Sequence, residues 1–375
     1  MKKIVLVGPV YPYKGGIAHY TSLLYRVLAE KYDVEMLSFK MQYPKFLFKK
    51  EQKDYSNDMF KVEKAQFLLH TANPFNIVTL GRRIRRQNPD LLILQWWHPY
   101  FAPCFRLLTA AAGGKVPLLY ICHNVLPHER FPMDKLLTKA ALDRGDLFIV
   151  HSRSDGEELL KLKKEAKFMR NPHPTYGSFQ VRNLTKSQAR AELGRKEEEK
   201  ILLFFGFVRE YKGLKTLLRA MPKIKACGGD IILIVAGSFD GDREEYVALL
   251  REMHIEEIVH IVDGYLPDNE VEKYFAACDL VVAPYESATQ SGIVQIAFGF
   301  EKPVVATNVG GLPDVVEDGR TGYVVEPGDP EALAEAVVKF FREKKGSAFR
   351  ENVRQEAGRF SWERMRETIE ELGGF

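Results

Sequence analysis

Residues 200–221 read KILLFFGFVREYKGLKTLLRAM, and this stretch decides the fold class. It begins with an unbroken apolar run that ends at Gly206, continues through a polar loop, and becomes amphipathic from Leu214 onward. An unbroken apolar run is typical of a strand that is covered on both faces. A buried strand that leads through a short loop into a helix predicts one unit of a parallel α/β sheet.

The same alternation recurs along the chain. The other apolar runs are IVLVGP, DLLILQWW, PLLYICHN and DLFIVHS in the first half, and DIILIVAG, DLVVAPY and PVVAT in the second. A stretch without periodicity, about residues 171–200, separates the two series. We therefore predict an α/β protein with two Rossmann-like βαβ domains that face each other across a ligand-binding cleft. The predicted parts are residues 1–172, a linker at 173–199, a second domain at 200–359 and a final helix at 360–375.

Composition narrows the cellular setting. The four cysteines are widely spaced and form no zinc or disulfide pattern, which favours reduced thiols in a cytoplasm. No run of about 18 apolar residues occurs, and the apolar start of the chain is interrupted at Gly8 and Pro9. We expect neither a signal peptide nor a membrane span, but a soluble or peripheral cytoplasmic protein.

Charge is distributed unevenly. Residues 1–170 hold 28 Lys and Arg against 16 Asp and Glu, whereas the remainder holds 26 against 34. This split argues against a nucleic-acid partner and favours one basic domain that faces an anionic surface or ligand. The strongest basic cluster lies beside the apolar segment 46–48, which suggests anionic lipid at the inner face of the cell membrane, although a solvated helix face explains the same residues. The cluster comprises Arg82, Arg83, Arg85, Arg86, Lys45, Lys49, Lys50 and Lys53.

Several glycine-containing turns follow predicted strands. In the second half, Arg209 and Lys212 occupy the loop between Gly206 and the next helix, and Ser291 with Gly292 begins a later helix. Cations and helix N-termini both stabilise a diphosphate leaving group. These residues therefore predict a diphosphate site, with two solvated loop cations as the alternative for the basic pair.

Further glycine pairs occur at Gly310-Gly311 and, in the first half, at Gly15-Gly16 before a helix expected from Ile17. Free backbone N–H groups at such a position accept a phosphate or another closely approaching ligand. A dinucleotide fingerprint is absent after the first strand. Alone, the first-half pair is equally typical of a structural turn.

Residues 302–337, KPVVATNVGGLPDVVEDGRTGYVVEPGDPEALAEAV, resemble the donor-domain signature of glycosyltransferase family 4. Residues 8–24, GPVYPYKGGIAHYTSLL, are similar to the first loop and helix of that family. The resemblance implies a GT-B fold and a retaining, metal-independent transferase without a cofactor. Its expected substrates are a nucleotide-diphosphate sugar and a glycan or lipid-linked acceptor, in bacterial-type surface polysaccharide or glycoconjugate synthesis. It further implies that Arg209 and Lys212 hold the donor diphosphate and that the final helix packs back on the first domain.

The sequence departs from the family at two positions. Ala288 and Ile296 stand where the family commonly has glutamates that contact the hexose and the ribose. We hypothesise that Gln295 or Gln290 supplies the missing hydrogen bonds. The family arginine usually follows the glycine directly, so its role is carried to Arg209 with a shift of two positions.

Histidines provide candidates in the first half. His123 and Asn124 end an apolar run, where a functional side chain belongs, and His123 resembles the family histidine that touches the transferred sugar. A structural histidine is the alternative. His98 and the pair His128-Glu129 are candidates for the acceptor pocket, with a purely structural role as an equal alternative. The nearby aromatic residues Trp96, Trp97 and Tyr100 suit a sugar ring, a lipid or ordinary core packing.

Asp240-Gly241-Asp242 matches the metal-binding triplet of GT-A transferases. Aspartates beside glycine are also ordinary turn and helix-cap residues, and we interpret them so.

Two other functions compete with sugar transfer. The segment SGIVQIA, residues 291–297, resembles the phosphate and ribose loop of non-hydrolysing sugar-nucleotide 2-epimerases. The absent glutamates are also compatible with a non-catalytic subunit that binds nucleotide sugars. In the preferred mechanism, His123, Arg209 and Lys212 are catalytic. Gly16, Gly206, Ser291, Gly292 and Gln295 bind the nucleotide, and Gly15, His98, Asn124 and Gln290 contact sugar or acceptor.

Overall fold

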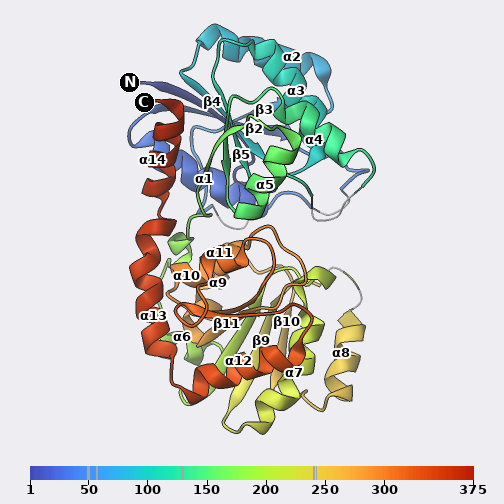
Figure 1. Ribbon diagram of the computed structural model, residues 1–375, viewed down its shortest axis with the longest axis vertical. Helices are drawn as coiled ribbons and strands as arrows, with labels where there is room; N and C mark the ends of the chain where they lie inside the picture. Colours follow the sequence, from blue (N-terminus) through green and yellow to red (C-terminus); the bar gives the residue numbers. More distant parts are fainter. Residues whose placement is uncertain (49–50, 56–57, 128–130, 240, 242) are drawn as a thin grey trace. The chain divides into compact units, whose positions relative to one another are not determined.

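The computed structural model describes residues 1–48, 51–55, 58–127, 131–239, 241 and 243–375 (Figure 1). The chain forms two compact units, Met1–Pro172 together with Ser361–Phe375, and His173–Phe360. Each unit contains one sheet in which all paired strands are parallel. The predicted α/β class with two Rossmann-like units is therefore confirmed.

The first unit contains a seven-stranded sheet with the order β3-β2-β1-β4-β5-β6-β7. Its central strands are buried throughout their length, because helices cover both faces. This explains why the strands appear as unbroken apolar runs in the sequence. The strands are β1 Lys3–Val7, β2 Asp33–Met41, β3 Gln66–His70, β4 Leu91–Trp96, β5 Leu118–Cys122, β6 Leu147–Val150 and β7 Lys167–Arg170.

The sheet of the first unit has one apolar layer of helices on each face. On one face, α2 (Pro74–Gln87), α3 (Ala102–Ala112), α4 (Asp134–Leu142) and α5 (Arg153–Leu162) contribute to the larger apolar cluster. On the other, α1 (Gly16–Ala29) and α14 (Trp362–Gly373) pack against the sheet and against each other (Figure 1). The last helix thus completes the layer that α1 begins.

Polar contacts fix α14 beside α1. Ser361 caps the helix by accepting a hydrogen bond from the backbone N–H of Arg364, at 3.0 Å. The carboxylate of Glu370 accepts hydrogen bonds from Tyr32 Oη at 2.7 Å and from Lys31 Nζ at 2.9 Å. These bonds tie the end of the described chain to the end of the first helix.

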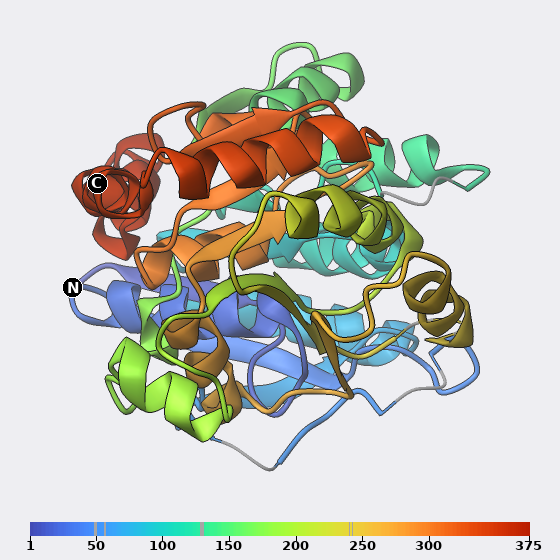
Figure 2. The same ribbon diagram turned by 90° about the horizontal axis from the view of Figure 1, so that it is seen from below.

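The second unit contains a six-stranded sheet with the order β10-β9-β8-β11-β12-β13. Helices α7 and α12 lie side by side over one face, as Figures 1 and 2 show. The strands are β8 Lys200–Phe205, β9 Ile231–Gly237, β10 Val259–Asp263, β11 Leu280–Ala283, β12 Val304–Thr307 and β13 Gly322–Val325. The helices are α6 Lys186–Glu192, α7 Leu214–Ala226, α8 Arg243–Glu252, α9 Asp268–Ala277, α10 Gly292–Gly299, α11 Leu312–Val315, α12 Pro330–Arg342 and α13 Gly346–Gln355.

Residues 173–199, expected as a linker, are part of the second unit. Helix α6 packs against α9. The buried carboxylate of Glu272 on α9 accepts hydrogen bonds from the backbone N–H groups of Val181, Arg182 and Leu184. Backbone groups of this segment are therefore satisfied by the second unit itself.

The strand orders define where ligands are expected. In the first unit the direction of winding reverses between β1 and β4, and in the second it reverses between β8 and β11. Parallel α/β sheets bind ligands outside the carboxyl ends of the strands at such a switch point. We therefore expect the ligand-binding residues in the loops that follow these four strands.

Candidate functional site

The loop after β8 carries the predicted basic pair. Arg209 is exposed and precedes a short 3₁₀ helix, Glu210–Lys212, which leads into α7. Gly213, between the two helices, has a φ of 68°, and a Cβ at this position would lie 1.8 Å from the carbonyl oxygen of Pro284. Only glycine permits this approach, so the loop after β8 packs directly on the segment that follows β11.

Lys212 is buried in this loop, with 9% of its surface exposed. Its ammonium lies 5.3 Å from the centroid of the Tyr285 ring. Burial lowers the pKa of Lys212, and the charge of Arg209 acts in the same direction, against an opposite contribution from Tyr211. Among the described residues, no carboxylate forms an ion pair with Lys212. A buried cation without a counter-charge is unfavourable, so this ammonium is suited to an anionic ligand.

Tyr285 connects Lys212 to the start of α10. Its hydroxyl lies 3.1 Å from Ser291 Oγ, and burial raises the pKa of Tyr285 to about 12, so the phenol stays neutral. Ser291 Oγ also accepts a hydrogen bond from the backbone N–H of Val294, at 3.3 Å. The hydroxyl that we predicted for phosphate binding is therefore the N-cap of α10. Exposed Gly292 is the first residue of the helix, where backbone N–H groups attract anions.

The glutamine candidates lie on α10 and in the loop before it. Gln295 is buried, and among the described residues its Oε1 atom has no hydrogen-bond partner. Gln290 is half-buried, as is Ala288, whereas Ile296 is buried. The loop after β12 joins this group, because the backbone N–H of Gly311 donates to the carbonyl oxygen of Thr289 at 2.8 Å. The second unit thus gathers its candidates at the carboxyl ends of three neighbouring strands.

In the first unit, the loop after β1 leads to the glycine pair. Gly15 is the N-cap of α1, and Gly16 is the first residue of that helix, one residue earlier than expected. A Cβ added at either glycine would meet nothing within 4 Å. Open space beside a helix start leaves the backbone accessible to a ligand.

His123 follows β5 and is buried, with 3% of its surface exposed. Its Nε2 atom lies 2.6 Å from Oε1 of Gln95, the residue before the end of β4. The ring of Tyr20 from α1 meets the imidazole edge-on, with a centroid distance of 4.6 Å and an interplanar angle of 89°. Asn124 beside it is half-buried. Gln95 was missed from the sequence, although it is the one polar residue inside the apolar run LLILQWW.

The remaining first-unit candidates have structural contacts. His98 accepts a hydrogen bond at Nδ1 from the backbone N–H of Tyr100, at 3.1 Å, and so caps a 3₁₀ turn. Trp96 and Trp97 are buried in the core, and their indole N–H groups donate to Val125 O and Tyr43 Oη. Core packing, one of the three possibilities that the sequence allows, accounts for both tryptophans. The predicted residues Lys49, Lys50, His128, Glu129, Asp240 and Asp242 lie outside the described residues.

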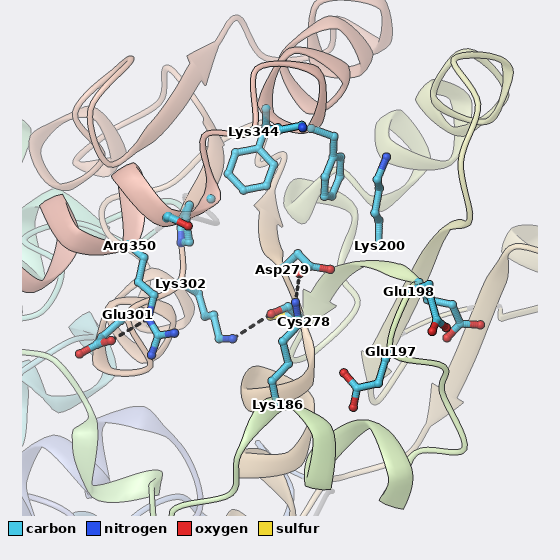
Figure 3. Close-up of a pocket in the computed structure, with 16 residues that line it drawn as sticks. Lys186, Glu197, Glu198, Lys200, Cys278, Asp279, Glu301, Lys302, Lys344 and Arg350 are labelled. Carbon is cyan, nitrogen blue, oxygen red and sulfur yellow. Dashed lines mark hydrogen bonds and ion pairs between the residues drawn. The ribbon is translucent and has the colours of Figure 1, made fainter.

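A separate pocket of about 460 Å³ lies at the opposite, amino-terminal edge of the second sheet (Figure 3). Its half-buried Lys302 donates to the carbonyl oxygens of Ala276 and Cys278, at 3.0 and 2.9 Å. Lys186 forms an ion pair with Asp279. A further ion pair, at 2.9 Å, joins Arg350 to Glu301. These charges are compensated within the protein, so the pocket has a structural explanation.

Two family models match the chain. Residues 14–170 match the model described as Glycosyltransferase Family 4, and residues 185–359 match Glycosyl transferases group 1. The chain belongs to the family 4 glycosyltransferases. This membership makes it a hexosyltransferase-type enzyme and confirms the resemblance seen in the sequence.

Known relatives of this glycosyltransferase differ in their acceptors. D-inositol 3-phosphate glycosyltransferase 1 of Catenulispora acidiphila is 29% identical over 275 residues, which cover 68% of this chain and 65% of that protein. N-acetyl-alpha-D-glucosaminyl L-malate synthase of Bacillus anthracis is 24% identical over 363 residues, covering 92% and 90%.

A solved structure supports the fold. HepE of Anabaena, crystallised in complex with UDP and glucose, matches this glycosyltransferase with a TM-score of 0.74 at 19% identity, over 99% of this chain and 100% of that one. At this identity the likeness concerns the fold, which is the predicted GT-B class.

Proposed function

We propose that the enzyme is a retaining transferase that moves a hexose from a nucleoside-diphosphate sugar to a glycan or lipid-linked acceptor. We place this reaction in bacterial-type cell-surface polysaccharide or glycoconjugate synthesis. The observation that carries the proposal is buried Lys212, which has no carboxylate partner among the described residues and contacts Tyr285 beside the start of α10. A diphosphate is the ligand that such a group of donors suits best.

The proposed mechanism depends on neutralising the leaving group. Lys212, Arg209 and the first turn of α10 bind the diphosphate and stabilise the charge that develops when the glycosidic bond breaks. Each well-placed donor contributes about 3 kcal/mol. The acceptor hydroxyl attacks from the face that the leaving group vacates, so the anomeric configuration is retained. His123 contacts the transferred sugar, and we expect neither a protein nucleophile nor a metal cofactor.

Gln295 takes the place of a family glutamate in this proposal. Its buried Oε1 atom, which lacks a partner among the described residues, accepts a hydrogen bond from a donor hydroxyl. Hydrogen-bonding a buried oxygen removes the cost of its desolvation. Gly206 and Gly16 contact the nucleotide in this proposal. A Cβ at Gly206 would crowd the proposed diphosphate ligand, at 3.2 Å from Lys212 Nζ, and the space beside Gly16 is open.

An anionic membrane surface on the cytoplasmic side is the proposed location of the acceptor. Phe46 is 78% exposed, and Leu47 and Phe48 beside it are exposed as well, flanked by Lys45 and Lys53. Exposed apolar side chains between lysines favour the interface of an anionic bilayer. No helix in the described part of the chain is long and apolar enough to cross a membrane.

The α2 arginines divide into two groups. Arg82, Arg85 and Arg86 are exposed and add positive potential to the first unit. Arg83 instead forms an ion pair with Glu35, at 2.6 Å, and is unavailable for lipid. The proposed membrane surface therefore relies mainly on the segment 45–48 and Lys53.

Incubation with radiolabelled nucleoside-diphosphate hexoses tests the function. Donors are first selected by the rise in melting temperature that binding produces. The selected donor is then combined with membrane lipid extract or glycan acceptors, and the anomeric configuration of the product is determined by NMR. Radiolabel in a lipid or glycan with retained configuration supports the proposal. Formation of the 2-epimer without an acceptor identifies an epimerase, and binding without turnover identifies a non-catalytic subunit.

A further inference from the structure

The structure places a buried amide beside the histidine that we assign to the sugar. Gln95 is fully buried on β4, and β4 pairs with β5 so that Gln95 lies opposite Ile121. Side chains two residues apart along a strand share a face, which brings Gln95 and His123 together. The bond between Gln95 Oε1 and His123 Nε2, at 2.6 Å, is the result.

We propose that Gln95 is a positioning residue for sugar transfer, which holds His123 in one tautomer and one ring orientation. This inference rests on the proposed function, in which His123 contacts the sugar. With Oε1 as the acceptor, His123 Nε2 carries the proton and donates. The imidazole then presents Nδ1 as its acceptor nitrogen, because a neutral imidazole has one donor and one acceptor.

Neighbouring residues favour a single arrangement of this pair. A Cβ at residue 8, directly after β1, would lie 2.6 Å from Gln95 Cγ, so Gly8 leaves the space that Gln95 fills. Tyr20 restricts the imidazole from the side of α1. Among the described residues, His151 lies near the ring, with a centroid distance of 5.4 Å, and Asp155 Oδ1 accepts from the N–H of Val125, two residues along the chain.

A purely structural role does not explain the choice of glutamine. Gln95 Nε2 is buried, and among the described residues it has no hydrogen-bond partner. A buried donor without a hydrogen bond is unfavourable, and an apolar residue at this position would avoid that cost. Such a cost calls for an explanation, and the contact of the amide oxygen Oε1 with His123 provides one.

Three variants test the inference. Gln95→Glu introduces a carboxylate next to the imidazole and favours the imidazolium ion. Gln95→Leu removes the acceptor with little change in volume. Gln66→Leu is the matched control, since Gln66 lies on β3 and bonds to Glu35 and Arg83 instead. The readouts are the ¹⁵N-histidine NMR titration of His123, assigned with His123→Gln, and the pH profile of kcat/KM.

In Gln95→Glu, the titration midpoint of His123 is expected to rise by about one pH unit or more. The acidic limb of the kcat/KM profile should move in the same direction, because a protonated ring cannot accept a hydrogen bond at Nδ1. In Gln95→Leu, the ¹⁵N shifts should show a mixture of tautomers. Its kcat should fall about 10-fold or more, while the affinity for the donor nucleotide stays unchanged.

An unaltered His123 titration in Gln95→Glu overturns the inference. So does a Gln95→Leu enzyme with the kcat and pH profile of the wild type, or a Gln66→Leu control with the same defects. If the wild-type enzyme transfers no sugar, the proposed function fails. The tautomer and titration of His123 then still decide whether Gln95 positions the ring.

Discussion

The side chain of Tyr285 contacts both the ammonium of Lys212 and the hydroxyl of Ser291. Lys212 Nζ is 5.3 Å from the Tyr285 ring centroid, and Ser291 Oγ is 3.1 Å from the Tyr285 hydroxyl. One buried phenol therefore positions both a cation and a helix start. Tyr285, two residues after the end of β11, thus determines where the two proposed diphosphate contacts lie.

Replacement of the buried cation should separate stability from activity. Lys212→Ala is expected to lower kcat by about 100-fold, because one donor to the leaving diphosphate is lost. Stability should be maintained or increase, since the variant removes a buried charge that has no carboxylate partner among the described residues. Lys215→Ala is the control, as this lysine lies three residues further on, in α7, and pairs with Glu245 at 2.7 Å. Wild-type turnover in Lys212→Ala would refute the assignment.

Loss of the α10 cap should affect both folding and binding. Ser291→Ala is expected to lower the free energy of unfolding by about 1 kcal/mol, measured by urea denaturation. The donor nucleotide should also bind more weakly, because the helix start and Tyr285 lose their mutual support. Ser361→Ala removes the equivalent cap of α14. That variant should lose stability alone, and a matching loss of nucleotide affinity there would argue against a specific role for α10.

Gln295→Leu should have opposite effects on stability and binding. The variant removes a buried oxygen that has no partner among the described residues, so the free enzyme should be as stable as the wild type or more so. Donor affinity should fall about 10-fold, the equivalent of one hydrogen bond. Calorimetry and thermal denaturation measure the two quantities, with exposed Gln355→Leu as the control. Unchanged donor affinity would show that Gln295 does not replace a family glutamate.

Phe46→Asp should reduce membrane association. We expect about 10-fold weaker sedimentation with phosphatidylglycerol vesicles, since a large apolar side chain no longer enters the interface. Binding of both proteins should weaken with added salt and be slight on phosphatidylcholine vesicles. Val181→Asp changes an exposed apolar residue of the second unit in the same way. Equal vesicle binding by Phe46→Asp and the wild type would rule out this surface.

The edge of the second sheet has a pH-dependent ion pair. Arg354, with help from Arg350, lowers the pKa of Glu301 to about 2 against the effect of burial. A carboxyl whose folded pKa is depressed stabilises the protein above its ordinary pKa of 4.5, and this stabilisation disappears as the pH falls through about 2.

Glu301→Gln should therefore lower the free energy of unfolding at pH 7 by about 1 kcal/mol. It should also flatten the decline in stability between the ordinary pKa and about 2. Denaturation at a series of pH values measures both effects. Glu63→Gln, at an exposed position in the first unit, should change neither. A pH dependence identical to that of the wild type would show that the Glu301 pair contributes nothing.

The architecture could be predicted because it depends on periodicity. Strands buried on both faces appear as apolar runs, and the helices near Ile17 and Leu214 begin within one residue of their expected positions. The sequence also indicates which loops follow strands, and so which residues are candidates for a ligand. These features require only local information.

Pairings between loops could not be predicted. In the sequence, Gln95 is one residue of an apolar strand, and its partner His123 is distant along the chain. Tyr285 lies in a turn whose shape the sequence does not give, so its contacts with Lys212 and Ser291 could not be foreseen. The role of Ser291 as the cap of α10 depends on backbone geometry in the same way, and its contact with phosphate stays a prediction. Trp96 and Trp97 could not be assigned to core or ligand without the positions of α3 and Tyr43.

Because α14 belongs to the first unit, that unit can be completed only late in synthesis. Trp362 contacts Tyr20 at a centroid distance of 5.0 Å, and Tyr20 in turn contacts His123. The ribosome makes Trp362 only after all of residues 173–360. Until then, the apolar face that α14 covers in the first unit stays exposed while the second unit is synthesised. Closure of that layer during translation therefore comes last, and a chain that stalls before residue 361 leaves the support of His123 incomplete.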